Sequence, residues 1–249
     1  MTRYEVIGVA GVPEVEPGAD LVGLILGAAA HQNTPVAGGD LLVIGQKIVS
    51  KAEGRLVRLS EVTPSAIAQS LAPGHGRDAR LVEVILRESR RVVRMDRGVL
   101  ITETHHGWVC ANAGVDQSNV DVDTVALLPE DPDRSARELR EGIRARGGLD
   151  VAVIIADTFG RPWREGLTNV AIGLAGFAPL KSYLGEPDSA GRPLQATVIA
   201  LADKLAGAAE PVMGKLDRVP VAIVRGLSLA GGDEGSKSLL RDPARDLFR

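Results

Sequence analysis

Two short aliphatic runs constrain this chain more than any other feature of its 249 residues. They are Leu-Leu-Val-Ile at 41–44 and Val-Ala-Val-Ile-Ile-Ala at 151–156. Each has the length of a strand, and neither shows the polar alternation of a half-exposed strand, so both are predicted to be buried strands. Helical patterns are interleaved with them, but clustered strands at 92–111 break a strict βαβ alternation. The predicted fold class is therefore α/β, of the mixed α+β kind.

The remaining elements follow from periodicity and from residues that begin or end helices. Helices are predicted at 21–30, 78–90, 133–146 and 195–209, and one more is opened by Thr63 as N-cap and Pro64 at its first position. Strands are predicted at 4–12 and 219–225, with two or three between 92 and 111. Residues 169–178 are predicted to form a strand pair, or a strand and a bend. The tail from Gly231 is predicted to be a flexible loop with a short helix.

Composition excludes several classes of protein. With 3 Phe, 2 Trp and 2 Tyr, the core must be aliphatic, and stacking platforms for single-stranded nucleic acid are nearly absent. A net charge of −3 also argues against binding a phosphate backbone. The single cysteine, Cys110, excludes a disulfide framework within the chain and a cysteine-rich zinc site. There is no signal-peptide pattern and no apolar run of roughly 18 residues, so we expect a cytoplasmic protein with no membrane partner.

Two segments resemble nucleotide-binding signatures and fail the test of context. Residues 74–79 match the loose dinucleotide fingerprint, but they follow a predicted helix instead of a strand. Residues 231–238 resemble a phosphate loop in composition, but they lack the Gly-Lys pair and follow the last predicted strand. The sequence therefore predicts neither a Rossmann nor a P-loop fold.

The strand at 151–156 is followed at once by Asp157 and Thr158. An apolar strand that ends in a carboxylate is a recurrent way to hold Mg²⁺ or Mn²⁺ beside a phosphate. Arg161, Trp163 and Arg164 come next, and guanidinium groups match phosphate or carboxylate forks. The alternative is a solvated loop in which the aspartate caps a turn.

Three further segments carry candidate polar side chains. Asp116, in a glycine-containing turn, is a candidate ligand for the same ion as Asp157, with an Asx-type turn as the alternative. Lys47 and Lys51 would favour an anion if a helix begins there, and are otherwise a surface pair. The loop at 213–215 is a further candidate for phosphate contact. The adjacent histidines at 105–106 are predicted to make a hydrogen-bonded turn, because neighbours on a strand point to opposite faces and do not share a metal ion.

Taken together, these segments resemble the coenzyme F-420:L-glutamate ligases, also called F-420-0 γ-glutamyl ligases. The matching stretches occur in the family's order along nearly the whole chain. They lie at 48–55, 80–89, 103–107, 111–119, 157–164 and 220–226.

The resemblance implies an enzyme that adds L-glutamate to the F-420 precursor (F-420-0), and then further γ-linked glutamate, while releasing GDP and phosphate. GTP is the implied co-substrate. Mn²⁺ or Mg²⁺, as two divalent ions, and K⁺ are the implied cofactors. A two-lobed, family-specific fold in an intertwined homodimer is also implied. We expect residues 1–249 to form a single ligase domain, without the C-terminal flavin-reductase-like domain of some relatives.

The family's site residues carry over by motif. Asp116 and Asp157 would hold one divalent ion, and Thr158 would help to hold a second. The implied GTP-binding residues are Gly11, Val12, Pro13, Glu14, Gln46, Lys47, Lys51, Asn119, Met213, Gly214, Lys215, Leu216, Asp217, Arg218, Val219 and Pro220. Lys215 departs from the pattern, because some members have a metal-binding Gln there and a protonated lysine cannot serve as that ligand. Contact between Lys215 and phosphate is the alternative.

Amide formation requires an activated carboxylate, so the expected route passes through an acyl phosphate made with the γ-phosphoryl group of GTP. No residue is assigned as general base. Three alternatives stay open: a ligase acting on another carboxylate cofactor, a nucleotide-binding regulatory module, and a metal-dependent phosphohydrolase.

Overall fold

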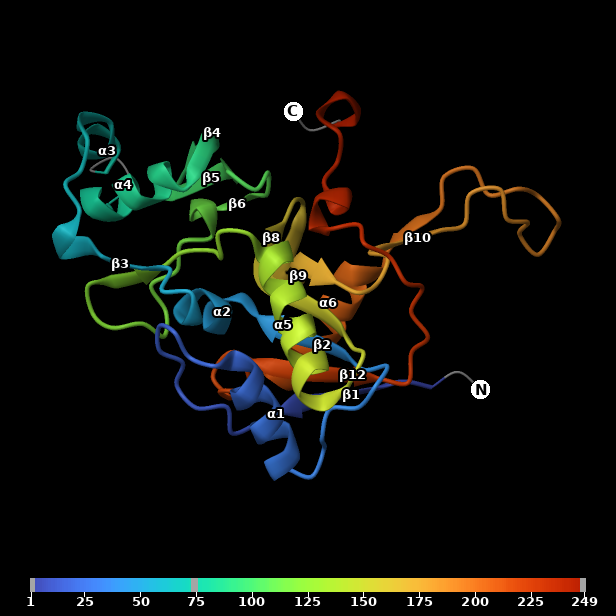
Figure 1. Cartoon of the computed structure of the whole chain (residues 1–249). Helices are drawn as coiled ribbons and strands as arrows, with labels where there is room; N and C mark the ends of the chain where they lie inside the picture. Colours follow the sequence, from blue (N-terminus) through green and yellow to red (C-terminus); the bar gives the residue numbers. More distant parts are fainter. Residues whose placement is uncertain (1–2, 73–75, 247–249) are drawn as a thin grey trace.

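A five-stranded mixed sheet forms the centre of the computed structural model, which describes residues 3–72 and 76–246 (Figure 1). Its strand order is β1 (Glu5–Val9), β12 (Val221–Arg225), β2 (Leu41–Gly45), β8 (Ala152–Arg161) and β9 (Arg164–Ala175). β2 and β8 pair in parallel, and the other neighbouring pairs are antiparallel. The two predicted buried strands are thus confirmed, and they lie side by side.

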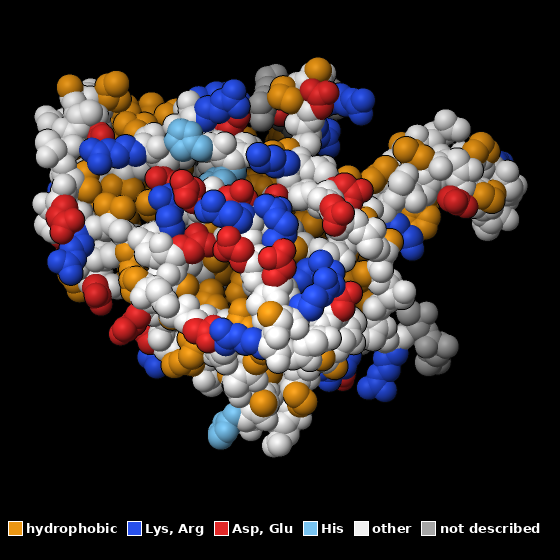
Figure 2. Space-filling view, in the orientation of Figure 1, with side chains coloured by type: hydrophobic (Ala, Val, Ile, Leu, Met, Phe, Trp, Pro, Cys, Tyr) orange, Lys and Arg blue, Asp and Glu red, His pale blue; other side chains and the backbone are white. Residues whose placement is uncertain are grey.

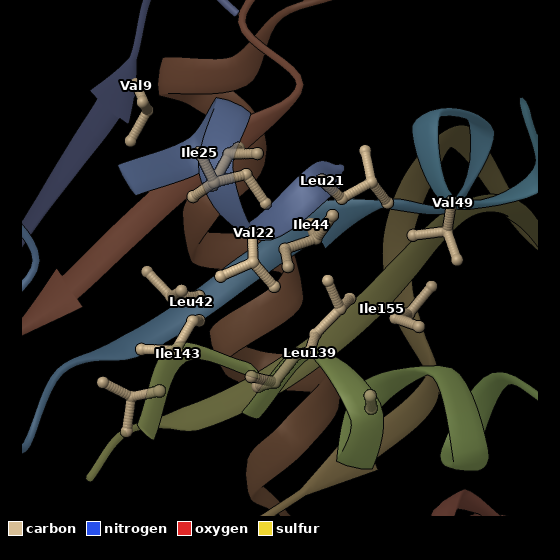
Figure 3. Close-up of a cluster of buried hydrophobic side chains, with 14 of the residues drawn as sticks. Val9, Leu21, Val22, Ile25, Leu42, Ile44, Val49, Leu139, Ile143 and Ile155 are labelled. Atoms are coloured by element: carbon tan, nitrogen blue, oxygen red, sulfur yellow. The ribbon is translucent and has the colours of Figure 1, made fainter. Parts of the chain in front are cut away.

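Helices cover both faces of this sheet. Helices α1 (Leu21–His31) and α5 (Pro132–Gly147) pack on one face, where Leu42 and Ile44 point (Figure 3). Helix α6 (Leu201–Met213) packs on the other, against Leu41 and Val43. Because both faces are covered, successive residues are all apolar, which explains the uninterrupted runs.

A close approach ties α5 to the sheet and to the end of the chain. A Cβ atom on Gly173 of β9 would lie 2.4 Å from the carbonyl oxygen of Pro132, so only glycine lets the helix start here. The carboxylate of Asp133 accepts hydrogen bonds from the amides of Leu174 and Ser236, each 2.9 Å long. Ser236 is buried. The prediction of a flexible tail is therefore wrong at Ser236, although short 3₁₀ helices do form at Ser236–Leu239 and Pro243–Arg245.

A second group of elements has its own hydrophobic cluster, which includes Leu59, Ile85 and Leu100. It contains a three-stranded sheet that confirms the strands expected within 92–111, a two-stranded sheet, and two helices. These elements are β4 (Ser89–Asp96), β5 (Val99–Thr104), β6 (Val109–Ala111), β3 (Leu56–Arg58), β7 (Thr124–Ala126), α3 (Ala66–Leu71) and α4 (Ala79–Arg87), with a 3₁₀ helix at Leu59–Glu61. The described residues form a mixed α/β fold without a closed barrel.

The surface carries two further features in Figure 2. Acidic and basic side chains are interspersed over the face of α5, where Arg140 and Arg144 both pair with Asp150. An arm formed by β10 (Leu180–Ser182), β11 (Val198–Ala200) and the loop between them projects from the rest of the chain. No helix in the described ranges is long and apolar enough to cross a membrane.

Two predicted helices start at other residues. Helix α3 begins at Ala66 with Ser65 as N-cap, because the Ser65 hydroxyl accepts from the amide of Ala68 while Thr63 and Pro64 stay outside. Within the helix predicted at 195–209, residues 198–200 form strand β11 because they pair with β10, and α6 begins only at Leu201. Helix α4 ends at Arg87, since the chain from Ser89 onward pairs with β5.

The junction of α3 and α4 predicts a specific acid response. The buried Glu83 carboxylate accepts hydrogen bonds from the Ser65 amide (2.9 Å) and from Arg87 Nε (2.8 Å). Ser65, and then Arg87, hold the pKa of Glu83 at about 2 instead of 4.5. A depressed carboxyl pKa stabilises the fold fully above the unfolded value of 4.5, and that contribution is lost as the pH falls toward about 2.

We expect Glu83→Gln to lower the free energy of unfolding at pH 7 and to flatten its decline between pH 4.5 and about 2. Urea unfolding across this pH range measures both effects. Glu138→Gln, at an exposed position on α5, serves as the control. A variant that loses stability on acidification as steeply as the parent would refute this account of Glu83.

Candidate active site

One edge of the central sheet collects most of the residues singled out from the sequence. Val9, Val221, Ile44 and Ile155 form a single row across four neighbouring strands. The chain therefore leaves the sheet at this edge after β1 and after β2, and it enters the sheet here before β12. Strand β8 continues past the end of β2 at the same edge. Residues 10–14, 45–51, 157–158 and 213–220 meet there because strand direction and register put them there.

Lys47 links the end of β2 to the second group of elements. It opens helix α2 (Gln46–Ala52), and its Nζ lies 2.8 Å from Asp116 Oδ2 and 2.6 Å from the Ser118 hydroxyl oxygen. The other oxygen of Asp116 accepts from the amide of Ser118 at 2.7 Å. Backbone bonds between Asp116 and Ala126 hold the aspartate beside β7. The Asx-type turn, the alternative interpretation of Asp116, is thus present, and it also positions the carboxylate against a lysine.

Thr158 connects the other side of this edge. Its hydroxyl donates to Asn169 Oδ1 on β9 at 2.7 Å and accepts from Lys215 Nζ at 2.5 Å. The amide of Thr158 donates to Asp157 Oδ1 at 2.8 Å. Lys215 is therefore beside Asp157 and Thr158.

Electrostatics distinguishes the two carboxylates. Burial raises the pKa of Asp157 to about 6, the amide of Thr158 opposes this, and the nearby Asp116 raises it further. Burial would also raise the pKa of Asp116, but the hydrogen bonds from Lys47 and Ser118 outweigh it and leave that pKa below its usual value. Asp116 is thus held as an anion, whereas ionised Asp157 is costly unless a cation is close.

The oxygen atoms at this edge fit a cation that is shared with a bound phosphate. Among the described residues, no group of three or more His, Cys, Asp or Glu side chains could hold a metal ion. Mg²⁺ is often held by one or two carboxylates, with waters and substrate phosphates completing its shell. Asp116, Asp157 and the Thr158 hydroxyl match that pattern, and the raised pKa of Asp157 marks a carboxylate that a cation would stabilise.

Other residues predicted to contact GTP lie around these groups. Lys51 is buried and pairs with Glu14, which joins α2 to the loop after β1. The amide of Gly45 donates to the carbonyl of Pro220 at 2.8 Å, so the segment before β12 packs on the start of α2. Asn119 and the side chain of Leu216, which is 91% exposed, lie at the surface. The structure thus brings the predicted segments together at this edge of the sheet.

The arginine-rich segment after Asp157 is not a loop over the site. β8 continues to Arg161 and turns back into β9, which runs unbroken through most of 169–178. The expectation that the strand ends at Asp157 is therefore wrong, because β9 extends the pairing beyond β2. Arg161 and Trp163 lie at the hairpin tip, about 13 Å along the strand from Asp157.

The histidines behave as predicted. His105 Nε2 lies 2.8 Å from the carbonyl oxygen of Arg87, and His106 Nε2 lies 2.9 Å from that of Pro129. Cys110 is buried and free, as expected for a small hydrophobic side chain. Of the two rejected nucleotide signatures, residues 73–75 lie outside the described residues, and 231–238 follow β12 and end in a 3₁₀ helix.

Sequence reasoning missed Ser118 and Asn169 as members of the site. Asn169 lies opposite Thr158 in the β8–β9 register, and it is the one buried amide side chain in β9. Its position directly before the apolar second half of β9 is a usable signal. Recognising Asn169 as a site residue also requires the pairing of β8 with β9, which the sequence does not predict.

Comparison with known proteins decides the family. A sequence profile described as F420-0:Gamma-glutamyl ligase matches residues 10–226. The chain belongs to the F420-0:gamma-glutamyl ligase family. The resemblance inferred from the motifs is thus confirmed, and the chain is a member of a family of ligases.

Three curated relatives, each named "Coenzyme F420:L-glutamate ligase", extend this match over most of the chain. The protein of Methanopyrus kandleri is 48% identical over 95% of this chain and 94% of its own length. That of Methanothermobacter thermautotrophicus is 45% identical over 98% of both chains. The Methanocaldococcus jannaschii protein is 41% identical over 86% of both. The F420-0:gamma-glutamyl ligase family assignment therefore covers every segment of the candidate site.

Proposed function

We propose that this chain is a GTP-dependent ligase that adds L-glutamate to the F-420 precursor F-420-0 and then adds further γ-linked glutamate. Family membership supports the acceptor and the amino acid, since the relatives are named for that pair. The observation that supports the use of GTP is the convergence of charged side chains at one edge of the sheet. These are Lys47, Asp116, Asp157 and Lys215. Such a site offers both carboxylates for cations and lysines for anions.

The proposed chemistry has two steps. An oxygen of the acceptor carboxylate attacks the γ-phosphorus of GTP, the bond from that phosphorus to the bridging oxygen breaks, and GDP leaves. The free amine of L-glutamate then attacks the acyl carbon, the bond from that carbon to the phosphate oxygen breaks, and phosphate leaves as the nitrogen gives up a proton. GTP and the acceptor are both anionic, so positioning and charge neutralisation are the main contributions asked of the protein.

Each residue has a role in this proposal. Lys47 and Lys215 offset the negative charge of the phosphates, and Thr158 orients Lys215 through its hydroxyl. Asp116 and Asp157 would hold a divalent ion, Mn²⁺ or Mg²⁺, with Thr158 serving a second one. When bound, these ions would neutralise phosphate charge. K⁺ as a helper ion rests on the family resemblance.

Mass spectrometry of a reaction with F-420-0, GTP, L-glutamate and Mn²⁺ or Mg²⁺ tests the proposal. We expect products heavier than the acceptor by whole glutamyl residues, with sustained GDP formation, beyond one equivalent of enzyme, only when both acceptor and glutamate are present. GDP release without any acceptor would indicate a phosphohydrolase. GTP binding without turnover would indicate a regulatory module. Turnover only with a different carboxylate acceptor would identify another ligase.

We also propose that the chain works as a cytoplasmic homodimer. The projecting β10–β11 arm and the exposed apolar side chains of Trp163 (78%), Leu167 (63%) and Leu184 (53%) support a partner surface. Light scattering should give twice the mass of one chain, and a monomeric mass at assay concentration would contradict the dimer.

A further inference from the structure

A groove lies directly beside Asp116, on the side formed by the second group of elements. It has a volume of about 560 Å³ and opens between the start of α4 and the chain that follows β6. Leu81, Ile85 and Val115 are the apolar residues of its lining, while Arg77, Asn112 and Ser118 supply polar atoms. A groove of this volume, with several convergent polar groups and some apolar lining, is large enough to seat an organic ligand. None of the residues predicted to bind GTP lines it.

Arg77 is the notable charge in this groove. It is partly buried, and its Nη1 donates to Asn112 Oδ1 at 2.8 Å. Neighbouring arginines each pair with a carboxylate, as Arg55 does with Glu88 and Arg87 with Glu83. Within residues 3–72 and 76–246, no carboxylate lies within 4 Å of the Arg77 nitrogens. A guanidinium group carries five N–H donors, so most of this fork is available to a ligand.

The segment after β6 holds Asn112 against this arginine at a conformational cost. Asn112, Ala113 and Gly114 have successive φ values of 55°, 54° and 71°, in the left-handed region that side chains other than glycine rarely adopt. A Cβ atom on Gly114 would lie 2.7 Å from Leu128 Cγ, so packing holds the turn in place. Strained backbone of this kind persists where surrounding structure enforces it, and it is common in ligand sites.

The acidic side chain that also lines the groove does not neutralise Arg77. Asp78 caps helix α4 through the amide of Arg80, and Arg80 Nη2 pairs with its carboxylate at 2.6 Å. At the other end of the groove, Asp116 is engaged by Lys47. Arg77 therefore presents a positive fork in a groove whose lining also includes Asp116.

We propose that Arg77, oriented by Asn112, binds a carboxylate of an organic substrate, and that the groove seats the rest of that molecule. This inference rests on the proposed function, which requires two carboxylate-bearing substrates, the acceptor and L-glutamate. A planar guanidinium binds a carboxylate through two parallel hydrogen bonds. The KM values for the acceptor and for L-glutamate identify which of the two substrates supplies the carboxylate that Arg77 binds.

Steady-state kinetics of Arg77→Gln and Asn112→Asp test the proposal. The second variant puts a carboxylate against Arg77 at a left-handed position that aspartate tolerates, so it should occupy the fork without unfolding the turn. We expect both to raise KM for one carboxylate substrate about tenfold or more, the scale of a lost charge-assisted hydrogen bond. Arg77→Lys keeps the charge but not the fork, and should be intermediate. The Kd for GTP, measured by equilibrium titration, should not change.

Two controls match these substitutions. Asn33→Asp makes the same change at an exposed position with φ of 61°, away from the groove, and Arg87→Gln removes an arginine from helix α4, which begins two residues after Arg77. If Arg77→Gln and Asn112→Asp are active and keep unchanged KM values for both carboxylate substrates, this inference is overturned but the proposed function is not. A loss of GTP affinity as large as the rise in KM would have the same consequence. Absence of any ligation by the unaltered chain would overturn the proposed function and this inference with it.

Discussion

Asp157→Asn should abolish ligation while leaving the fold at least as stable as before. We expect kcat/KM to fall by at least about a hundredfold, the scale on which removing one electrostatic group slows an enzyme. The same change removes a carboxylate whose pKa burial raises to about 6. A raised carboxyl pKa destabilises the fold fully above that value and not at all below the unfolded value of 3.8. The unfolding free energy at pH 7 should therefore stay level or increase.

Asp116→Asn should remove activity as well, but with the opposite effect on stability. Its carboxylate is held ionised by Lys47, so the amide leaves that lysine without its ion pair and lowers the free energy of unfolding at pH 7. Product analysis and urea unfolding, applied to both variants, separate the two effects. Full ligation by either variant would exclude that residue from the proposed cation site.

Asp203→Asn is the matched control for Asp157. Asp203 lies in the first turn of α6, burial raises its pKa as well, and it accepts a hydrogen bond from the amide of Ala171. The α6 helix reaches the candidate site only at its far end, near Met213. The control variant should therefore keep its ligation activity.

Asp40→Ala should cost about 3 kcal/mol of unfolding free energy, the scale for breaking a buried ion pair. Asp40 is 1% exposed and holds Arg225 through two bonds of 2.8 and 2.7 Å, while it also accepts from the amide of Ala37. Because Asp40 precedes β2 and the candidate site follows it, the variant should retain activity in its folded fraction. Urea unfolding and activity per folded molecule are the measurements.

Asp150→Ala breaks an exposed counterpart for comparison. Asp150 pairs with Arg140 and Arg144, but its side chain is 67% exposed, so we expect a loss of no more than about 1 kcal/mol. If the two substitutions cost the same, burial is not what gives the Asp40–Arg225 pair its importance. Loss of ligation by folded Asp40→Ala would show that this end of the sheet communicates with the site.

The sequence predicted elements well where one local signal dominates. The runs at 41–44 and 151–156 are apolar throughout because both sheet faces are covered, and the charged helix α5 has a marked amphipathic pattern. It was less accurate where pairing partners decide the structure. Residues 198–200 lie within a stretch predicted to be helical, yet they pair with β10, and β8 extends past Asp157 because β9 lies beside it.

By itself, the sequence determined the family, the aliphatic core and the identity of most candidate site residues, because these depend on residue types in short local patterns. Only the tertiary structure decided which charges meet. Lys215 faces Thr158 because parallel and antiparallel strands of the central sheet end in one row. Lys47 faces Asp116 because the second group of elements packs against the end of β2. The contact of Arg77 with Asn112, in a groove that Asp116 also lines, is likewise a product of packing between elements far apart in the chain. Register and packing are long-range properties, so no local motif encodes them.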